Sequence, residues 1–284
     1  MIQALIFTDL DGTLLDDRYD LTGAASAMDE MSELGGVVIP VSSKTRVEMA
    51  SLREQQAIET PFVFENGAGI DWGDDQRWAG GLGDLPHGTR LEGLDYANLC
   101  EQLATLRDQL DINFVGFHDF SAEQVSELTN LPLQYARLAK QRLASEPIAG
   151  LDQNDQVLIL EKALVKQGLL LQKGGRFYTV TSRREKSDAV AEVISVVQAR
   201  TDRALQVVVC GDSPNDLSML ALGDLAFLFS CVSVDSSELE GDGVDYQREM
   251  KGYLGGVAPA TRVVEVCGAG HEAWLHAVTK ELQG

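Results

Sequence analysis

The sequence predicts an α/β protein in which a doubly wound parallel sheet carries an inserted α+β unit. Three observations predict this fold class. Short apolar segments alternate with segments of helical periodicity near both ends of the chain. Several of these apolar segments end abruptly in polar side chains, as buried parallel strands do. The length of 284 residues corresponds to two domains of about 150 residues each.

The first half of the parallel sheet is predicted from the N-terminal residues. An apolar run ends in Asp9-Leu-Asp-Gly12, and its length is typical of a buried strand. A helix is predicted to follow, with Thr22 as its N-cap and Gly35 at its end. The predicted strands are residues 3–8, 37–41 and 62–64, and residues 45–57 are predicted to be a second helix.

A change in composition marks the predicted insert. Residues 71–94 are rich in Gly and Asp and are predicted to be a linker. Beyond them, a capping box at Ser121 indicates a helix start, and Glu146-Pro147 is predicted to interrupt the regular structure. Further helices are predicted at residues 96–110 and 161–167, and strands at residues 113–117, 157–160 and 177–181. The predicted domains are residues 1–82 for the first part of the core, 83–181 for the insert and 182–284 for the second part of the core.

The doubly wound pattern resumes after the insert. Val190, Val193, Ile194 and Val197 lie on one face of a predicted amphipathic helix. A predicted strand at residues 205–209 is followed by Pro214, which is tolerated at the start of a helix. The remaining predicted elements are strands at residues 225–229 and 263–266 and a last helix at residues 272–282.

Composition and charge exclude several classes of function. Asp and Glu number 44 against 23 Lys and Arg, and the net charge of −21 repels nucleic acids and anionic lipids. No apolar run approaches the roughly 18 residues that cross a membrane, and no basic segment precedes the first apolar run. We therefore expect neither a membrane span nor a secretory signal.

The cysteines favour a reducing compartment. The four of them, Cys100, Cys210, Cys231 and Cys267, match no zinc or disulfide pattern. Cys210 and Cys267 end apolar runs and are predicted to be buried. A cytoplasmic location is therefore expected.

Acidic side chains follow two strands of the predicted sheet, at the edge where ligands bind in α/β folds. Asp9 and Asp11 follow the first strand, and Asp212 and Asp216 follow the strand at residues 205–209. Carboxylates packed together repel one another, and a shared proton or a hard divalent cation relieves that repulsion. Mg²⁺ suits oxygen ligands that act together with a substrate phosphate. A Mg²⁺ site at this edge is therefore one solution that the sequence allows, and a shared proton is the other.

The same edge offers the groups that phosphoryl transfer needs. An ionised aspartate beside a cation can act as a nucleophile, and a second carboxylate two residues on can act as acid and base. Ser42 and Ser43 follow the second predicted strand, and Lys44 and Lys186 supply positive charge for phosphoryl oxygens.

Two motifs resemble those of a known superfamily. Asp9-Leu-Asp-Gly-Thr-Leu-Leu15 resembles the first motif of the haloacid dehalogenase superfamily of phosphatases, and Gly211-Asp-Ser-Pro-Asn-Asp216 is similar to its fourth. The spacing from the second motif at Ser42 to the third at Lys186 implies a cap domain inserted between them.

A finer resemblance is to the mannosyl-3-phosphoglycerate phosphatases. Three stretches carry it, namely Pro40-Val-Ser-Ser-Lys-Thr45, Gly116-Phe-His-Asp-Phe-Ser121 and Ala139-Lys-Gln-Arg-Leu-Ala-Ser-Glu-Pro147. The resemblance implies a Rossmann-like core with a cap and a Mg²⁺ cofactor. It also implies hydrolysis of mannosyl- or glucosyl-3-phosphoglycerate, through an aspartyl-phosphate, to the glycosylglycerate, a compatible solute.

The resemblance implies roles for single residues. Asp9 is implied as the nucleophile and Asp11 as the acid and base, with Ser42 and Lys186 binding the phosphoryl group. The implied metal ligands are Asp9, the main-chain carbonyl of Asp11, Asp212 and Asp216, and the implied substrate contacts are Ser43, Lys44, Arg142, Ser145 and Glu146. In the insert, Arg142 is expected to face the glycerate carboxylate or the phosphate, and Glu146 the sugar hydroxyls.

Several alternatives stay open. The third-motif lysine of the superfamily usually follows Gly, whereas Lys186 follows Glu185, so Arg184 is an alternative for part of its role. The enzyme could instead be another phosphatase or mutase of the superfamily, acting on sucrose, trehalose or hexose phosphate. A phospho-acceptor switch would also use strand-end carboxylates and Mg²⁺, but it would leave the insert without a role. The expected partner is a small phosphorylated sugar, and the sequence predicts no oligomeric state.

Overall fold

The computed structural model describes residues 2–16, 20–56, 58–74, 77–80, 82–151, 153–174, 176–230, 250–256 and 258–283. Five parallel strands form its main sheet, in the order β12-β11-β10-β1-β2. These strands are β1 (Ala4–Thr8), β2 (Gly36–Pro40), β10 (Gln206–Gly211), β11 (Leu225–Ser230) and β12 (Arg262–Cys267). The chain winds outward from β1 in both directions, so the predicted doubly wound sheet is confirmed.

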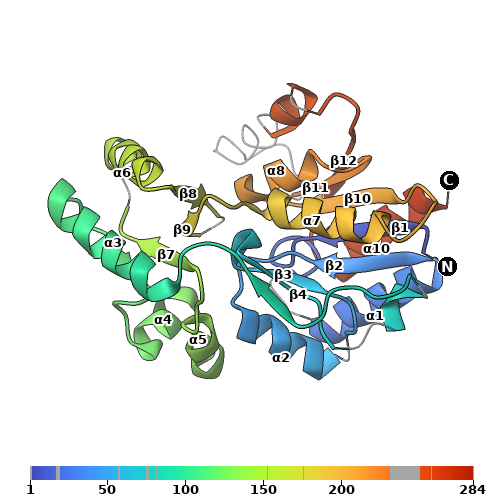
Figure 1. Cartoon of the computed structure of the whole chain (residues 1–284), viewed down its shortest axis with the longest axis horizontal. Coiled ribbons are helices and arrows are strands. Elements are labelled where there is room, and N and C mark those ends of the chain that lie inside the picture. Colours follow the sequence, from blue (N-terminus) through green and yellow to red (C-terminus); the bar gives the residue numbers. More distant parts are fainter. Residues whose placement is uncertain are drawn as a thin grey trace, which may run out of the picture.

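Helices cover both faces of this sheet (Figure 1). On one face lie α1 (Leu21–Glu33), α2 (Arg46–Gln56) and α10 (His271–Leu282), and on the other lie α7 (Lys186–Gln198) and α8 (Leu217–Leu220). Side chains alternate between the faces, as a strand requires. Leu5 belongs to the apolar core under α7, whereas its neighbour Ile6 belongs to the core with Met28 and Trp274. The sheet is therefore buried on both sides.

A small antiparallel sheet extends the edge of the core beyond β2. It consists of β3 (Phe62–Phe64), β4 (Gly69–Asp71) and β5 (Thr89–Leu91), and the short 3-10 helix η1 (Glu65–Gly67) joins the first two strands. A second 3-10 turn, η2 (Arg77–Ala79), lies between β4 and β5. The prediction of a linker over residues 71–94 is therefore wrong for β5. The glycines there allow turns that return the chain to pair with β4, and sequence composition does not report such pairing.

A four-stranded antiparallel sheet in the order β6-β7-β9-β8, together with four helices, forms the cap. The cap elements are α3 (Tyr96–Leu110), β6 (Val115–Gly116), α4 (Ala122–Thr129), α5 (Leu133–Ala139), β7 (Ser145–Ala149), α6 (Asn154–Lys166), β8 (Leu169–Lys173) and β9 (Tyr178–Ser182). It lies beside the core in Figure 1 and has an apolar core of its own, which includes Leu99, Leu103, Ile148, Leu160 and Val180. The predicted helix at residues 96–110 and the capping box at Ser121 are confirmed.

The predicted strand at residues 157–160 is wrong, because these residues lie inside α6. A short apolar run fits a strand or a helix equally well, and the surroundings decide between them. Leu160 and Leu164, one helical turn apart, are buried in the cap, whereas Leu158 and Ile159 remain exposed. The strand β8, which follows α6, was not predicted.

The predicted interruption at Glu146-Pro147 is also wrong, because both residues lie within β7. The N–H and C=O groups of one residue point to the same side of a strand. The carbonyl of Pro147 accepts a hydrogen bond from the Phe117 N–H at 3.1 Å, next to β6. The missing N–H of Pro147 therefore faces β6, which is only two residues long, and costs the sheet little pairing.

Smaller predictions also need correction. The N-cap of α1 is Asp20, whose carboxylate accepts a hydrogen bond from the Gly23 N–H, and Thr22 lies within the first turn. Cys210 is buried as predicted, but Cys267 is exposed at the end of the outermost strand, β12. Cys231 lies outside the described residues. Within the described ranges, no helix is both long and apolar enough to cross a membrane.

Candidate active site

The carboxyl ends of β10, β1 and β2 bring the predicted site residues to one edge of the sheet. These three strands are parallel neighbours, so the residues after them lie side by side. The Asp9 N–H donates to the Cys210 carbonyl at 2.9 Å, and the Val41 N–H donates to the Thr8 carbonyl at 2.8 Å. The strand pairing therefore continues into the site and fixes the backbone position of Asp9.

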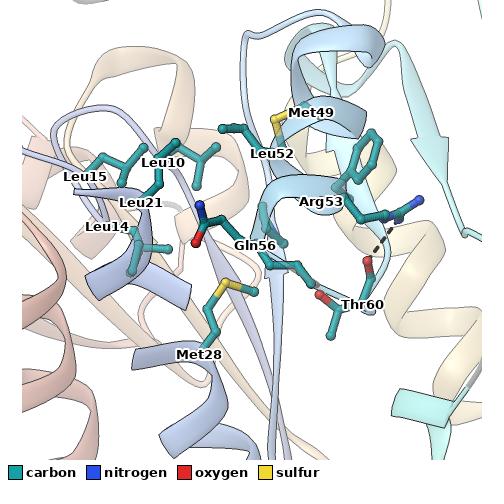
Figure 2. Close-up of a pocket in the computed structure, with 14 residues that line it drawn as sticks. Leu10, Leu14, Leu15, Leu21, Met28, Met49, Leu52, Arg53, Gln56 and Thr60 are labelled. Atoms are coloured by element: carbon teal, nitrogen blue, oxygen red, sulfur yellow. Dashed lines mark hydrogen bonds between the residues drawn. The ribbon is translucent and has the colours of Figure 1, made fainter. Parts of the chain in front are cut away.

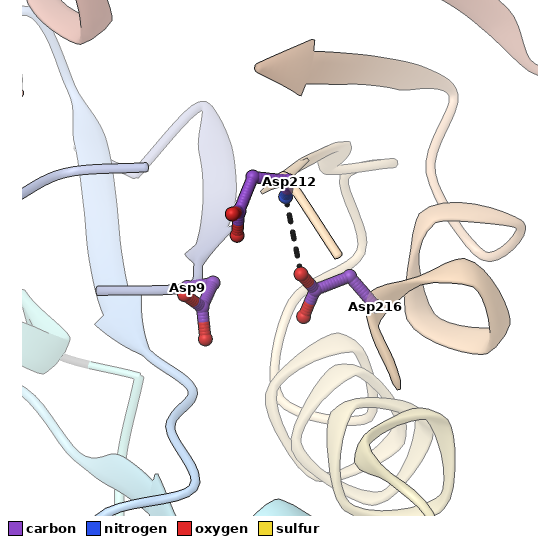
Figure 3. A group of neighbouring side chains, drawn as sticks. All are labelled: Asp9, Asp212 and Asp216. Atoms are coloured by element: carbon purple, nitrogen blue, oxygen red, sulfur yellow. Dashed lines mark hydrogen bonds between the residues drawn. The ribbon is translucent and has the colours of Figure 1, made fainter. Parts of the chain in front are cut away.

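Three aspartates gather at this edge. Asp9 follows β1, whereas Asp212 and Asp216 follow β10, and one carboxylate oxygen from each lies within 4.8 Å of the others (Figure 3). Asp9 is 6% exposed and Asp216 is fully buried. The cluster could hold a metal ion, because carboxylate oxygens at this separation are the donors that hard divalent cations bind.

Lys186 supplies the positive charge in this cluster. Its side chain is 1% exposed, and its Nζ lies 2.5 Å from Asp9 Oδ1 and 2.7 Å from Asp216 Oδ1. Arg184, the alternative candidate, instead donates to the Gly67 carbonyl at 2.6 Å and to Glu192 at 2.7 Å. The structure therefore brings Lys186, and not Arg184, to the aspartates.

Burial and neighbouring charges perturb the pKa values of this cluster. Burial raises the pKa of Asp9 well above its ordinary value, with Lys186 opposing the rise and the other aspartates adding to it. Burial and the neighbouring Asp216 raise the pKa of Asp212 to about 7. Burial alone would lower the pKa of Lys186, but Asp216 and Asp9 raise it above its ordinary value. One ammonium group therefore does not balance three carboxylates, and a cation would be attracted here.

Asp216 anchors the loop that carries Asp212. Its Oδ2 accepts hydrogen bonds from the N–H groups of Asp212 and Ser213, at 3.1 and 3.0 Å, and from the Ser213 hydroxyl at 3.0 Å. Its other oxygen faces Lys186. Protein donors therefore occupy the carboxylate oxygens of Asp216 more fully than those of Asp9 and Asp212, which are more available to a ligand.

Two glycines allow the chain to approach this site closely. A Cβ on Gly12 would lie 2.4 Å from Asp212 Oδ2, and the φ of Gly12 is +85°. A Cβ on Gly67 would lie 2.1 Å from the carbonyl oxygen of Glu185, which directly precedes Lys186. Both positions require glycine for conformation and for space.

The Asp11 side chain is not one of the three clustered carboxylates, although its charge contributes to the raised pKa values of Asp9 and Asp212. Its side chain is 46% exposed, and its Oδ2 lies 2.7 Å from the Nζ of Lys44. Lys44 follows Ser42, which is buried at the end of β2 and whose Oγ accepts from the Lys44 N–H at 3.2 Å. The predicted residues after β1 and β2 are thus brought together, and the side chain of Asp11 is partly exposed.

The predicted substrate contacts of the cap point in two directions. Arg142 and Ser145 face the core, where Arg142 Nη2 donates to the Ser43 carbonyl at 2.9 Å. Glu146 projects from the opposite side of β7 and accepts from the Tyr96 hydroxyl and the His118 N–H, both at 2.7 Å. Glu146 also lines a cavity of about 410 Å³ beside α3. Ser145 and Glu146 are adjacent residues of β7, so their side chains point to opposite faces of the strand.

Sequence reasoning missed Glu65. This fully buried residue of η1 accepts from the Ser145 hydroxyl at 2.8 Å and so joins the core to the cap. The sequence Glu65-Asn66-Gly67 has the composition of a turn after a strand, and such a turn at the sheet edge could also lie near a substrate. A carboxylate at the end of a strand of the predicted edge was the available signal.

A second cavity is too small for a sugar phosphate. It lies between α1, α2 and the loop after β1, and its side chains are largely apolar, including Leu10, Met28 and Met49 (Figure 2). Its volume is about 30 Å³, which is room for one or two water molecules.

Comparisons with known proteins show which family the chain is similar to. Residues 6–79 match the family model described as haloacid dehalogenase-like hydrolase. The chain is 33% identical over 228 residues to the glucosyl-3-phosphoglycerate/mannosyl-3-phosphoglycerate phosphatase of Persephonella marina, covering 79% of this chain and 84% of that protein. It is 32% identical over 230 residues, with the same coverage, to the protein of that name from Methanococcoides burtonii.

Solved structures share the fold at low sequence identity. A haloacid dehalogenase-like hydrolase from B. subtilis has a TM-score of 0.64 at 16% identity and covers 98% of both chains. Another, from Bacteroides thetaiotaomicron, has a TM-score of 0.61 at 12% identity and covers 98% of this chain and 99% of that chain. These likenesses extend over the core and the cap together.

Proposed function

Because the chain belongs to the haloacid dehalogenase-like hydrolases, within the family of the glucosyl-3-phosphoglycerate/mannosyl-3-phosphoglycerate phosphatases, we propose that it hydrolyses a glycosyl-3-phosphoglycerate. The products would be phosphate and the glycosylglycerate, with Mg²⁺ as cofactor. The observation that carries the proposal is the buried cluster in which Lys186 bridges Asp9 and Asp216 beside Asp212.

Asp9 is the proposed nucleophile. Its carboxylate attacks phosphorus, so that a bond from phosphorus to Asp9 forms while the bond to the glycerate oxygen breaks. Asp11, two residues on and more exposed, gives a proton to the leaving oxygen and later takes one from the attacking water. Water then releases phosphate and restores Asp9.

Ser42 and Lys186 are the proposed phosphoryl-binding groups. Ser42 lies buried at the end of β2, and its hydroxyl can donate to a phosphoryl oxygen. Lys186 neutralises charge on the phosphoryl group as well as on the aspartates. Ser43 and Lys44 complete the proposed substrate contacts of the loop after β2, and Lys44 is well placed for this because it already pairs with Asp11.

The donor set fits Mg²⁺. Asp9 and Asp212 would hold the ion by their carboxylates and Asp11 by its main-chain carbonyl, with Asp216 as a further ligand or as the anchor of Asp212. When bound, Mg²⁺ would offset the clustered negative charge and polarise the phosphoryl group. The raised pKa values of Asp9 and Asp212 support this assignment.

The substrate class follows from the names of the two relatives, and the cap is the proposed specificity unit. We propose residues 83–181 as the insert, between core segments 1–82 and 182–284. Another sugar-phosphate phosphatase or mutase of the superfamily is the second candidate, since the core chemistry would be the same. A charge of −21 disfavours nucleic acid and anionic membranes as partners.

A cytoplasmic location is proposed as well. Cys100, Cys210 and Cys267 are all free thiols in the described residues, which suits a reducing compartment.

Phosphate release tests the proposal directly. The purified chain would be assayed on mannosyl- and glucosyl-3-phosphoglycerate and on sucrose, trehalose and hexose phosphates, each with Mg²⁺ and with EDTA. We expect the highest kcat/KM on a glycosyl-3-phosphoglycerate and no turnover with EDTA. A highest kcat/KM on a hexose phosphate would favour the second candidate.

A further inference from the structure

The loop after β2, residues 42–45, is fixed on one side by three hydrogen bonds. The Ser42 carbonyl accepts from the Asn66 N–H at 3.0 Å, and the Lys44 carbonyl accepts from the Glu65 N–H at 2.9 Å. Between them, the Ser43 carbonyl accepts from Arg142 Nη2 at 2.9 Å. Two of the donors come from η1 in the core, and the third comes from the cap. The cap therefore contributes directly to the conformation of the phosphate loop, the name used here for residues 42–45.

Arg142 acts on Ser42 through a single peptide plane. The C=O and N–H groups of a trans peptide point in opposite directions. Since the Ser43 carbonyl points to Arg142, the N–H of Lys44 points away from it and donates to Ser42 Oγ at 3.2 Å. A hydroxyl oxygen that accepts on one side keeps its proton available for another acceptor. That acceptor, in the proposed reaction, is a phosphoryl oxygen.

Buried contacts hold Arg142 in this position. The residue is 7% exposed, and its Nε donates to the Ser145 carbonyl at 2.7 Å while Nη2 also donates to the Ser145 hydroxyl at 2.7 Å. The remaining nitrogen, Nη1, lies 3.4 Å from the Ala139 carbonyl. All three guanidinium nitrogens thus donate to protein oxygens, which leaves little donor capacity for a substrate.

Glu65 completes the charge balance. Its Oε2 accepts from the Ser145 hydroxyl at 2.8 Å and lies 3.9 Å from Arg142 Nε. Its two oxygens also accept from the N–H groups of Leu143 at 2.8 Å and Ala144 at 3.0 Å. A buried ion pair is tolerated when further hydrogen bonds satisfy both partners, and here they do.

The backbone at Glu65 is strained in a way that fits a functional position. Its φ is +48°, and that of Asn66 is +55°, which is uncommon for residues other than glycine and particularly for Glu. Strain of this kind persists where surrounding contacts determine the conformation, and it gathers at functional sites. The turn directs the N–H groups of Glu65 and Asn66 to the phosphate loop and the Glu65 carboxylate to the cap.

We infer that Arg142, held by Ser145 and Glu65, is a positioning residue that orients the Ser42 hydroxyl for the phosphoryl group, rather than a ligand of the organic part of the substrate. The inference rests on the proposed function. It assigns to the cap a contribution to the phosphate site that does not depend on what the phosphate is attached to.

Loss of a positioning residue and loss of a ligand of the organic part differ in their effect on a small substrate that lacks this organic part. We would measure kcat/KM for mannosyl-3-phosphoglycerate and for p-nitrophenyl phosphate, and the inhibition constant of inorganic phosphate, in Arg142→Ala and in the wild type. A misplaced phosphate loop should lower both kcat/KM values by the same factor, about 10- to 100-fold. The inhibition constant of inorganic phosphate should also rise, because phosphate is expected to contact Ser42.

Arg137→Ala is the matched control, because Arg137 is an exposed arginine of the same cap region, on α5. It should leave all three constants unchanged. A loss in Arg142→Ala confined to mannosyl-3-phosphoglycerate, with p-nitrophenyl phosphate and inorganic phosphate unaffected, would identify a substrate ligand and overturn the inference.

A second variant covers the case in which Arg142→Ala does not fold. Arg142→Lys keeps the charge but cannot reach Ser43 and Ser145 with separate nitrogens. It should also lower the two kcat/KM values equally, and unequal factors would overturn the inference. A wild type without activity on any phosphomonoester would instead refute the proposed function, so the two failures are distinguishable.

Discussion

The acidic cluster of the core and the contacts of Arg142 in the cap both contain buried polar side chains, but their charges are balanced differently. In the core, burial raises the pKa values of Asp9 and Asp212, and the neighbouring aspartates raise them further against the opposing charge of Lys186. In the cap, Arg142 is matched by Glu65 and by main-chain carbonyls. In this comparison the unbalanced carboxylates are those proposed to bind a cation and attack phosphorus, and the balanced Arg142 is the group proposed to position Ser42.

The largest effect is expected from Asp9→Asn. Loss of the proposed nucleophile should lower kcat by about a thousandfold or more. The melting temperature should not fall, because the substitution removes one charge from a crowded cluster and Lys186 keeps Asp216 as its partner. Asp29→Asn, on the exposed face of α1, is the control and should change neither quantity. Turnover close to wild type in Asp9→Asn would remove the nucleophile assignment.

The unbalanced charge of the cluster also predicts that the stabilisation of the fold by Mg²⁺ changes with pH. In the folded metal-free protein the pKa of Asp212 is raised from 3.8 to about 7. A raised carboxyl pKa contributes stability at low pH, and this contribution is lost as the pH rises through the folded value. Since Mg²⁺ binds the ionised form, adding it should raise Tm more at about pH 8 than at about pH 6.

Asp212→Asn sharpens this prediction. The Mg²⁺ concentration for half-maximal activity should rise about tenfold or more, and the Mg²⁺-induced rise in Tm should shrink at both pH values. Metal titrations and thermal melts would measure the two effects. Identical titrations for the variant and the wild type would mean that Asp212 does not bind the metal.

A buried carboxylate outside both regions should affect stability without affecting chemistry. Burial alone would raise the pKa of Asp71, but hydrogen bonds from Arg53 and Thr89 lower it below 3.8. A lowered carboxyl pKa contributes stability above the unfolded pKa, and this is lost as the pH falls through the folded value. Asp71→Asn should therefore lower the free energy of unfolding by about 1–3 kcal/mol near neutral pH.

Urea denaturation would measure that loss, which should diminish as the pH falls below about 4. The exposed neighbour Asp74 provides the control, since Asp74→Asn should leave stability unchanged. The kcat of folded Asp71→Asn should equal that of the wild type. A loss that is the same at neutral and acidic pH would contradict the charge-based explanation.

The smallest effect is expected from Glu146→Gln. The carboxylate of Glu146 is already occupied by Tyr96 and His118, and a glutamine retains an oxygen that can accept. The KM for mannosyl-3-phosphoglycerate should change by less than about twofold, and stability by less than about 1 kcal/mol. A tenfold rise in this KM, with p-nitrophenyl phosphate unaffected, would instead support Glu146 as a sugar contact.

The chain order of the core could be predicted because its signals are local. Strand-length apolar runs and the polar residues that end them predict where Asp9, Ser42 and Asp212 lie, since parallel strands share one carboxyl edge. The cap was predicted less well. The run at residues 157–160 fits two structures, and Pro147 was tolerated only because its neighbour β6 is so short.

By itself, then, the sequence determined the doubly wound core and the acidic edge, because hydrophobic periodicity and strand ends are properties of a few consecutive residues. Tertiary structure alone decided that Lys186 rather than Arg184 meets the aspartates, and that Glu65 and Arg142 meet at all. Glu65 and Arg142 are far apart in the chain and carry no local signal of their pairing. Only the packing of the cap against η1 brings their charges together and makes each the partner that the other needs in a buried setting.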